Sequence, residues 1–284
     1  MTLMKSLVTF AIGSWLAAGS ICFAAASLET VTVGYSSFSG AYVPLWIAVE
    51  ERLGRRHGLD LKAIYAGRIR PQQLLASGEV PFVIATGTGA LTSHILGVKD
   101  QEIILTFINK VNSAIFTRND IKTAEDLRGK KIGVTRIGAT THYFAVQAFK
   151  QRNMEAGRDY SMIQTGGAPE MLAALLSGAI DAGTMSAPWD ARAISQGYSY
   201  VVYGPDLRIP QVAVSLITRR SFMAQNSPLI GRFMRAMAEA AKVLHTDKEI
   251  VFKVLSKYLR IDDKKVLDQA YNAEIKALEP RMEL

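Results

Sequence analysis

The sequence predicts an α/β fold of two lobes, each a mostly parallel sheet flanked by helices. Apolar runs typical of strands alternate with runs typical of helices along the chain, and this order is typical of parallel sheets. The stretch "LASGEVPFVIATG", from Leu75, has an echo in "LLSGAIDAGTMSA", from Leu175. The chain has 284 residues, which is about the length of two ordinary domains.

In the first half of the chain, local patterns place the elements in order. "TVTVGYSS" at 30–37 is rich in β-branched residues, which favours a buried strand. The segment 42–58 has one apolar face and closes on Gly58, which favours a helix. Further strands are expected at 59–66, 80–86, 102–108 and 113–118, with a short helix at 71–77.

The second half repeats the alternation. Thr123 and Asp126 form a capping pattern for a helix at 124–127. From Asn226 onward the chain is expected to be mostly helical. Between these points, strands are expected at 131–136, 160–165, 179–186, 198–203 and 211–222, and helices at 138–153 and 169–178.

Two similar segments, "SAIFTR" and "VAVSLITR", are interpreted as the places where the chain crosses between lobes. Lobe I then comprises 27–118 plus 212–284, and lobe II is an insertion at 119–211. The repeated unit supplies one loop to each lobe. Because ligands bind outside the carboxyl ends of parallel strands, the two loops are expected to face each other across a cleft.

The N-terminus predicts a secretory signal peptide at 1–26. It has an early positive charge at Lys5, then an apolar run, then small residues at Ala24 to Ala26. The alternative is a retained membrane anchor, because the apolar run is about long enough to span a bilayer. The only cysteine, Cys22, follows Ile21 instead of a small residue, so lipoprotein anchoring at Cys22 is not expected. We therefore expect a periplasmic protein.

The distribution of charge and the cysteine content bear on the partners of the protein and on the source of its stability. The net charge is +8, but Lys and Arg are spread along the chain and form no run interleaved with aromatic residues. No nucleic-acid partner is expected from this distribution. After signal cleavage the chain has no cysteine, so its stability must come from its apolar core.

Three segments carry a family resemblance: "VTVGYSSFSGAYVPLWIAVEERLGRRHGLDL", the two "SG" units, and "AEDLRGKKIGVTRIGATTHYF". With them the chain resembles the solute-binding proteins of ABC importers, in particular the nitrate, sulfonate, taurine and pyrimidine-precursor (NMT1/THI5-like) group of the type II periplasmic binding proteins. The resemblance implies a two-lobed fold with a ligand cleft, a membrane permease as partner, a monomeric chain and no cofactor. Lobe I departs from the usual pattern at Pro81, where the second copy keeps Asp181.

The candidate ligand-binding residues follow the predicted strands. Small polar residues and glycines at such positions offer hydroxyls, N–H groups and close backbone approach. The alternatives are a plain helix cap, a tight turn, an arginine in solvent and a packing tryptophan. The candidates are Ser37, Phe38, Ser39, Gly40, Thr86, Gly87, Thr88, Arg136, Gly138, Thr140, Thr141, Ser186, Pro188 and Trp189.

Catalytic and metal-binding patterns are absent from the sequence. It has no G-x-S-x-G elbow, no H-E-x-x-H and no P-loop lysine motif. Its four histidines show no metal-ligand spacing, so no metal site is expected. Because the catalytic motifs are also absent, no enzymatic activity is expected.

We therefore expect the chain to capture a small solute and deliver it to a permease. Arg136 favours an anion such as a sulfonate, taurine or nitrate, whereas the aromatic residues favour a heterocyclic or aromatic compound. Two other functions stay open. One is an enzyme on the same fold, of the pyrimidine-precursor synthase or menaquinone-pathway type. The other is a ligand-binding sensor without transport.

Overall fold

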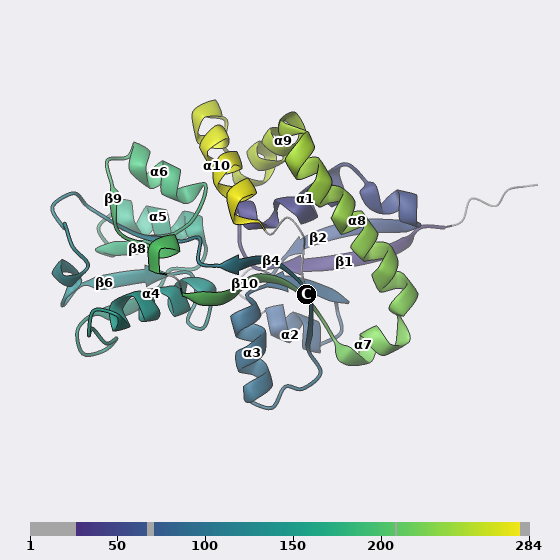
Figure 1. Ribbon diagram of the computed structural model, residues 1–284, viewed down its shortest axis with the longest axis horizontal. Coiled ribbons are helices and arrows are strands. Elements are labelled where there is room, and N and C mark those ends of the chain that lie inside the picture. Colours follow the sequence, from purple (N-terminus) through teal and green to yellow (C-terminus); the bar gives the residue numbers. More distant parts are fainter. Residues whose placement is uncertain (1–26, 67–70, 208, 279–284) are drawn as a thin grey trace, which may run out of the picture.

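The computed structural model describes residues 27–66, 71–207 and 209–278. They form two sheets side by side, each covered by helices (Figure 1). The sheet of lobe I has the order β2 (Leu59–Tyr65), β1 (Glu29–Tyr35), β3 (Phe82–Ala85), β10 (Pro210–Thr218), β4 (Glu102–Lys110). The sheet of lobe II has the order β7 (Ser161–Gln164), β6 (Lys131–Val134), β8 (Ala182–Met185), β5 (Ala114–Thr117), β9 (Ser199–Tyr203).

Among the described strands, one in each sheet runs against the rest. β10 pairs antiparallel with β3 and β4, and β5 pairs antiparallel with β8 and β9. The other pairs, β1 with β2 and β3 and β6 with β7 and β8, are parallel. The prediction of an α/β fold with two mostly parallel sheets is therefore confirmed.

The chain crosses between lobes through two short links. The first, 111–113, joins β4 to β5, and the second, η4 (Gly204–Leu207) with Ile209, joins β9 to β10. Val111 and Ile209 both pack in the core of lobe II. The first boundary, expected after Arg118, therefore lies before Ala114, because the strand at 113–118 finds its partners in the second sheet.

The repeated unit is also repeated in three dimensions. The helices α2 (Pro71–Ala76) and α5 (Ala168–Leu176) are each followed by a glycine with a positive φ, Gly78 at 81° and Gly178 at 75°. Glycine adopts this left-handed conformation without the steric cost that a Cβ would add. The strands β3 and β8 follow, and each ends at the junction between the lobes.

The reversed strands hold the two units in the same way. Thr218 Oγ1 on β10 donates to the carbonyl of Pro81 at 2.8 Å, and Thr117 Oγ1 on β5 donates to the carbonyl of Asp181 at 2.8 Å. A backbone carbonyl accepts each bond, so the change from Asp181 to Pro81 between the copies does not alter it. The similarity of "SAIFTR" and "VAVSLITR" thus has a structural counterpart.

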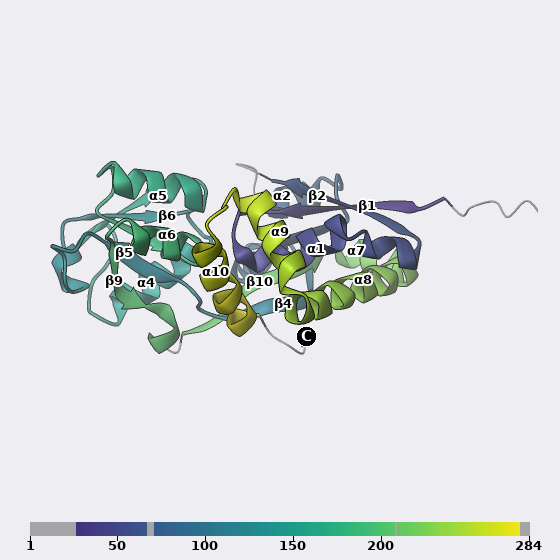
Figure 2. The same cartoon turned by 90° about the horizontal axis from the view of Figure 1, so that it is seen from above.

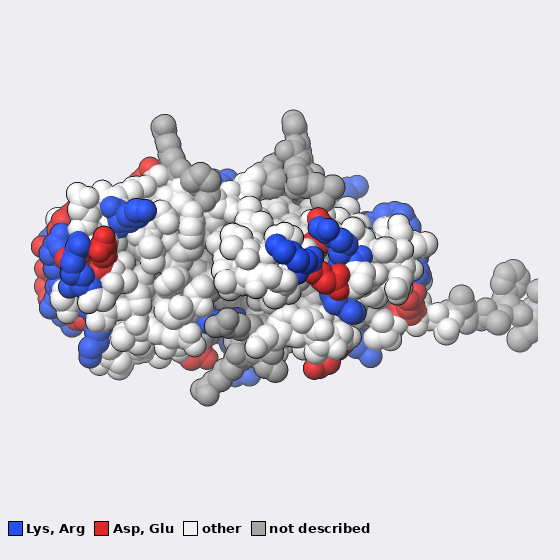
Figure 3. All heavy atoms as spheres, turned by 90° about the horizontal axis from the view of Figure 1, so that it is seen from below, with Lys and Arg blue, Asp and Glu red and all other residues white. Residues whose placement is uncertain are grey.

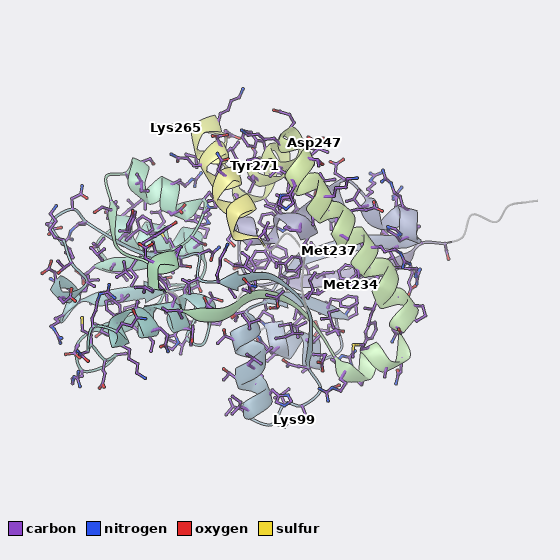
Figure 4. The ribbon with its side chains drawn as sticks, in the orientation of Figure 1. Lys99, Met234, Met237, Asp247, Lys265 and Tyr271 are labelled. Carbon is purple, nitrogen blue, oxygen red and sulfur yellow. The ribbon has the colours of Figure 1, made fainter. Side chains whose placement is uncertain are left out.

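Alternation along the strands separates two apolar layers in lobe I. Phe82 and Ile84 face the helices α1 (Val43–Glu50), α8 (Ser227–Thr246) and α9 (Lys248–Leu259), while Val83 and Ala85 face α2 and α3 (Gly87–Ile95). Phe82 stacks on Phe233 with ring centroids 4.5 Å apart. Figure 1 shows α8 and α9 on one side of the sheet and α3 on the other, and Figure 4 places Met234 and Met237 along α8.

Lobe II is layered in the same manner. α4 (Thr140–Lys150) covers one face, where Phe144 and Phe149 pack on Ile132. α5 and α6 (Trp189–Ser195) cover the other, where Met171 and Trp189 pack together. Burial of these apolar side chains stabilises the lobe by roughly 25 cal/mol for each Å² removed from water.

The C-terminal part of the chain returns to the junction between the lobes. α7 (Arg220–Gln225), α8 and α9 follow β10, and α10 (Lys264–Ala277) then lies against α6 of lobe II and η1 (Gly40–Tyr42). Figure 2 shows α10 where the lobes meet. Arg192 on α6 donates from Nη2 to the carbonyl of Arg260 at 3.1 Å, which adds a bond between the lobes.

Three predicted elements differ in extent. The helix expected at 42–58 divides into α1 and η2 (Leu53–His57), because Arg52 takes a left-handed φ of 51°. The helix at 124–127 is the short 3₁₀ segment η3 (Glu125–Leu127). The strand expected at 211–222 ends at Thr218, and α7 begins at Arg220.

The predicted signal peptide at 1–26 lies outside the described residues. Within the described part of the chain, no helix is both long and apolar enough to cross a bilayer.

Candidate functional site

A cavity of about 410 Å³ lies between the two lobes. This volume falls in the range of small-molecule sites. Its walls come from the loops that follow β1 and β3 in lobe I and β6 and β8 in lobe II, that is, from the carboxyl ends of parallel strands. The polar residues in its described lining are Ser36, Ser37, Ser39, Tyr42, Gln72, Gln73, Thr86, Thr92, Ser93, Gln101, Asn112, Ser113, Thr135, Arg136, Thr140, Thr141, Thr184 and Ser186.

The structure brings eight of the predicted ligand-binding residues into this lining: Ser37, Ser39, Thr86, Arg136, Gly138, Thr140, Thr141 and Ser186. The other six, Phe38, Gly40, Gly87, Thr88, Pro188 and Trp189, lie outside it. Thr86 and Ser186 hold equivalent places in the repeated unit, so both copies supply a hydroxyl to the cavity at this position.

Five of the six residues outside the lining make contacts close to the cavity. A Cβ on Gly87 would lie 2.4 Å from Val212 Cγ1, so β10 packs directly against this position. Thr88 Oγ1 donates to the carbonyl of Val212 at 3.4 Å. These two residues therefore fix α3 to β10, and the Thr88 hydroxyl bonds to the backbone of β10 and does not line the cavity.

Phe38, Gly40 and Trp189 join the lobes. Trp189 Nε1 donates to the carbonyl of Phe38 at 2.8 Å, and the amide of Gly40 donates to the carbonyl of Ala187 at 3.4 Å. A third bond joins Thr140 Oγ1 to the carbonyl of Ala213, at 3.3 Å. The two lobes are thus in direct contact around the cavity.

The turn after β6 is built around Thr141. Its Oγ1 accepts a hydrogen bond from the amide of Thr135 at 3.0 Å and lies 2.8 Å from Thr135 Oγ1. Gly138 has a φ of 85°, and nothing lies within 4 Å of the Cβ that another residue would carry there. The turn leads into α4, whose first residue is preceded by Ala139 without a side-chain cap. The N–H groups at this helix start therefore favour a negative group.

Two hydroxyls on the cavity wall have no hydrogen-bond partner among the described residues. They are Thr86 Oγ1 in lobe I and Thr184 Oγ1 in lobe II, and both atoms are buried. Thr86 precedes α3 but does not cap it through its side chain. Because a buried hydroxyl without a bond is costly, a ligand that bonds to these two atoms gains free energy.

The cavity is electrostatically one-sided. Arg136 is the only charged residue in its described lining. Tyr42 lies on the opposite wall, 2.7 Å from Ser36 Oγ through its hydroxyl, and burial raises the pKa of Tyr42 to about 12 despite the nearby Arg136. Tyr42 is therefore neutral at physiological pH.

Figure 3 shows that charged side chains gather mainly toward the outer end of lobe II and on lobe I, with uncharged residues over much of the surface between.

Local sequence patterns did not indicate several lining residues. Thr135 follows β6 directly, and Thr184 is the penultimate residue of β8. The rule that ligand-binding residues follow strands would include both if it also covered the last residues of each strand. Gln101 could not be predicted in this way, because it precedes β4 at the end of the sheet away from the loops.

Among the described residues, no group of three or more His, Cys, Asp or Glu side chains is placed to hold a metal ion.

Comparison with known proteins gives one family match. A model of the family described as NMT1/THI5 like matches residues 42–249. A search of curated proteins finds no match.

Solved structures share the fold. A protein from Bordetella bronchiseptica RB50 has a TM-score of 0.79 and 21% identity, over 91% of this chain and 85% of that one. The alkanesulfonate-binding protein SsuA from Xanthomonas axonopodis pv. citri, bound to MOPS, has a TM-score of 0.73 and 18% identity, over 88% and 85%. The periplasmic nitrate-binding protein NrtA from Synechocystis PCC 6803 has a TM-score of 0.71 and 18% identity, over 86% and 70%.

Proposed function

The chain belongs to the NMT1/THI5-like family, and from this premise we propose that it is the substrate-binding component of an ABC importer. It captures a small solute that carries an anionic group, closes its lobes on it and delivers it to a membrane permease. One observation carries the proposal: a cavity between two lobes, lined by both, has Arg136 as the only charged residue in its described lining.

The chemistry of the lining supports an anion. The guanidinium of Arg136 offers N–H groups that suit a sulfonate, carboxylate or nitrate. The start of α4 adds a partial positive charge. Two of the structural neighbours, an alkanesulfonate-binding and a nitrate-binding protein, are named for anions of this kind.

Closure supplies the mechanism. A solute held by Arg136, Thr184 and Ser186 in lobe II and by Ser37, Ser39 and Thr86 in lobe I bonds to both sides. Its binding energy then favours the closed arrangement, in which the bond between Trp189 and Phe38 also forms. The permease recognises the closed form.

The same proposal places the protein in the periplasm, after removal of residues 1–26, and assigns it no catalytic role. Asp, Glu, His and Lys are the side chains that most often act as general acids or bases, and a serine or threonine nucleophile needs such a base beside it. The described lining of the cavity contains no Asp, Glu, His or Lys.

A thermal-shift screen of the chain from Ser27 onward tests the proposal. The panel holds alkanesulfonates, taurine, nitrate, bicarbonate, aromatic carboxylates, pyrimidines and polyamines. A solute that binds only the folded state raises the melting temperature. We expect a concentration-dependent rise with anions and none with polyamines. A rise confined to cations or neutral compounds would overturn the anion assignment.

A further inference from the structure

The cavity extends beyond the loops between the lobes. The helices α2 and α3 both begin near these loops and run away from them along lobe I. Ala76 on α2 and Leu96 and Val98 after α3 line the same cavity as Arg136. α3 has nine residues and is therefore about 14 Å long. The cavity thus continues as a groove along lobe I.

The groove reaches a buried amide. Gln101 lines the cavity and is only 7% exposed, and neither its Nε2 nor its Oε1 has a hydrogen-bond partner among the described residues. It follows the loop that contains Lys99, which Figure 4 labels below α3 at the foot of lobe I. An unpaired buried amide costs free energy, so its presence calls for a partner.

The polar neighbours of Gln101 are already engaged with other groups. Asp100 accepts hydrogen bonds from the amide and the hydroxyl of Ser221, at 2.8 and 2.6 Å. Glu102 accepts from Nε and Nη2 of Arg220, at 3.0 and 2.7 Å. Among these three residues, only Gln101 has a side chain with no hydrogen bond to a described residue.

We propose that Gln101 is a second ligand subsite, which binds a carboxamide or lactam edge at the far end of an elongated anionic solute. An amide side chain donates through Nε2 and accepts through Oε1, so its best complement presents one acceptor and one donor side by side. Ala76, Leu96 and Val98 contact the apolar body between the two polar ends. This inference rests on the proposed function, since the anionic end binds at Arg136.

Two probe series test the subsite by calorimetry. One series carries a sulfonate at one end and a primary carboxamide at the other, with polymethylene spacers of increasing length. The other is identical but ends in a methyl ketone, which accepts a hydrogen bond and cannot donate one. At the spacer length that fits the groove, we expect the carboxamide to bind at least about tenfold more tightly than the ketone.

The Gln101→Leu variant should remove this preference and leave the affinity for a short alkanesulfonate unchanged. Its melting temperature without ligand should equal or exceed that of the wild type, because an unpaired buried amide is replaced by an apolar group. Gln151→Leu, at the exposed end of α4, is the matched control and should keep the preference.

The outcomes separate the two proposals. If short alkanesulfonates bind but carboxamide and ketone bind equally at every length, the subsite is refuted and the proposed function stands. If no sulfonate binds, the anion role falls and the subsite for an anionic solute falls with it. A preference that persists in Gln101→Leu would assign it to another residue.

Discussion

Trp189 Nε1 donates a hydrogen bond to the carbonyl oxygen of Phe38 at 2.8 Å, and this bond joins lobe II to lobe I. Both residues were predicted to contact the ligand, yet neither lies in the cavity lining. Their neighbours Ser37, Ser39 and Ser186 do line it. The pair therefore lies next to the site and connects its two walls, and its contribution to binding would be indirect.

Replacing Trp189 with Phe should weaken ligand binding without removing a ligand contact. The change deletes the indole N–H and keeps an aromatic ring, so the closed form loses about 1 kcal/mol, or roughly fivefold in Kd. Calorimetry with the anion selected by the thermal-shift screen measures the effect. Tyr198→Phe is the control, because Tyr198 OH donates to Leu175 within lobe II alone, at 3.3 Å. Equal affinities for the two variants would contradict a role in closure.

Replacing Arg136 with Ala should weaken an anionic ligand by at least about tenfold, a loss of ~1.4 kcal/mol. The guanidinium is the only charge in the described lining, so the variant should also bind with less dependence on salt. Titrations at two ionic strengths measure both effects. Arg118→Ala removes a surface arginine that pairs with Asp120 and should change neither. An unchanged Kd for Arg136→Ala would exclude Arg136 from the site.

Thr184→Val should lower ligand affinity and leave the free energy of unfolding at or above the wild-type value. The Thr184 hydroxyl is buried in the cavity wall and bonds to no described residue, so the folded chain alone loses no bond when it is removed. Thr117, on the neighbouring strand and equally buried, donates to the carbonyl of Asp181 at 2.8 Å.

Thr117→Val is therefore the matched comparison and should destabilise the fold by about 1 to 3 kcal/mol. Urea unfolding and ligand titration of both variants separate the two roles. If Thr184→Val destabilised the chain as much as Thr117→Val, the hydroxyl would have a structural partner.

Asp190 should make the stability of the protein depend on pH. Burial raises the pKa of Asp190 above its ordinary value of 3.8, although the amide of Ala191 donates to the carboxylate and partly offsets this. A raised pKa in the folded state means that folding favours the protonated form. The associated stability is present below the unfolded pKa and is lost as pH rises through the folded pKa.

Asp190→Asn should therefore gain stability relative to the wild type as pH rises from acid to neutral. Melting temperatures across this range measure the difference between the two proteins. A difference that is constant with pH would show that Asp190 titrates alike in the folded and unfolded chain.

Part of the site could be predicted because it depends on local order. A strand places the residues that follow it at the carboxyl end of a parallel sheet, which is why sequence could predict Thr86, Gly138, Thr141 and Ser186 near the cavity that they line. Which residues of these loops face the cavity and which face the protein could not be predicted. Gly87 and Thr88 adjoin Thr86 in sequence, but β10 occupies the space on their side.

The sequence by itself determined the α/β class, the two sheets and the repeated unit, because periodicity and turn residues act over a few positions. Only the tertiary structure decided that Trp189 meets Phe38, and that Gln101 lies in the same cavity as Arg136. These pairs are far apart along the chain. They are brought together by the packing of whole helices and sheets, which depends on buried surface summed over both lobes and not on any single local pattern.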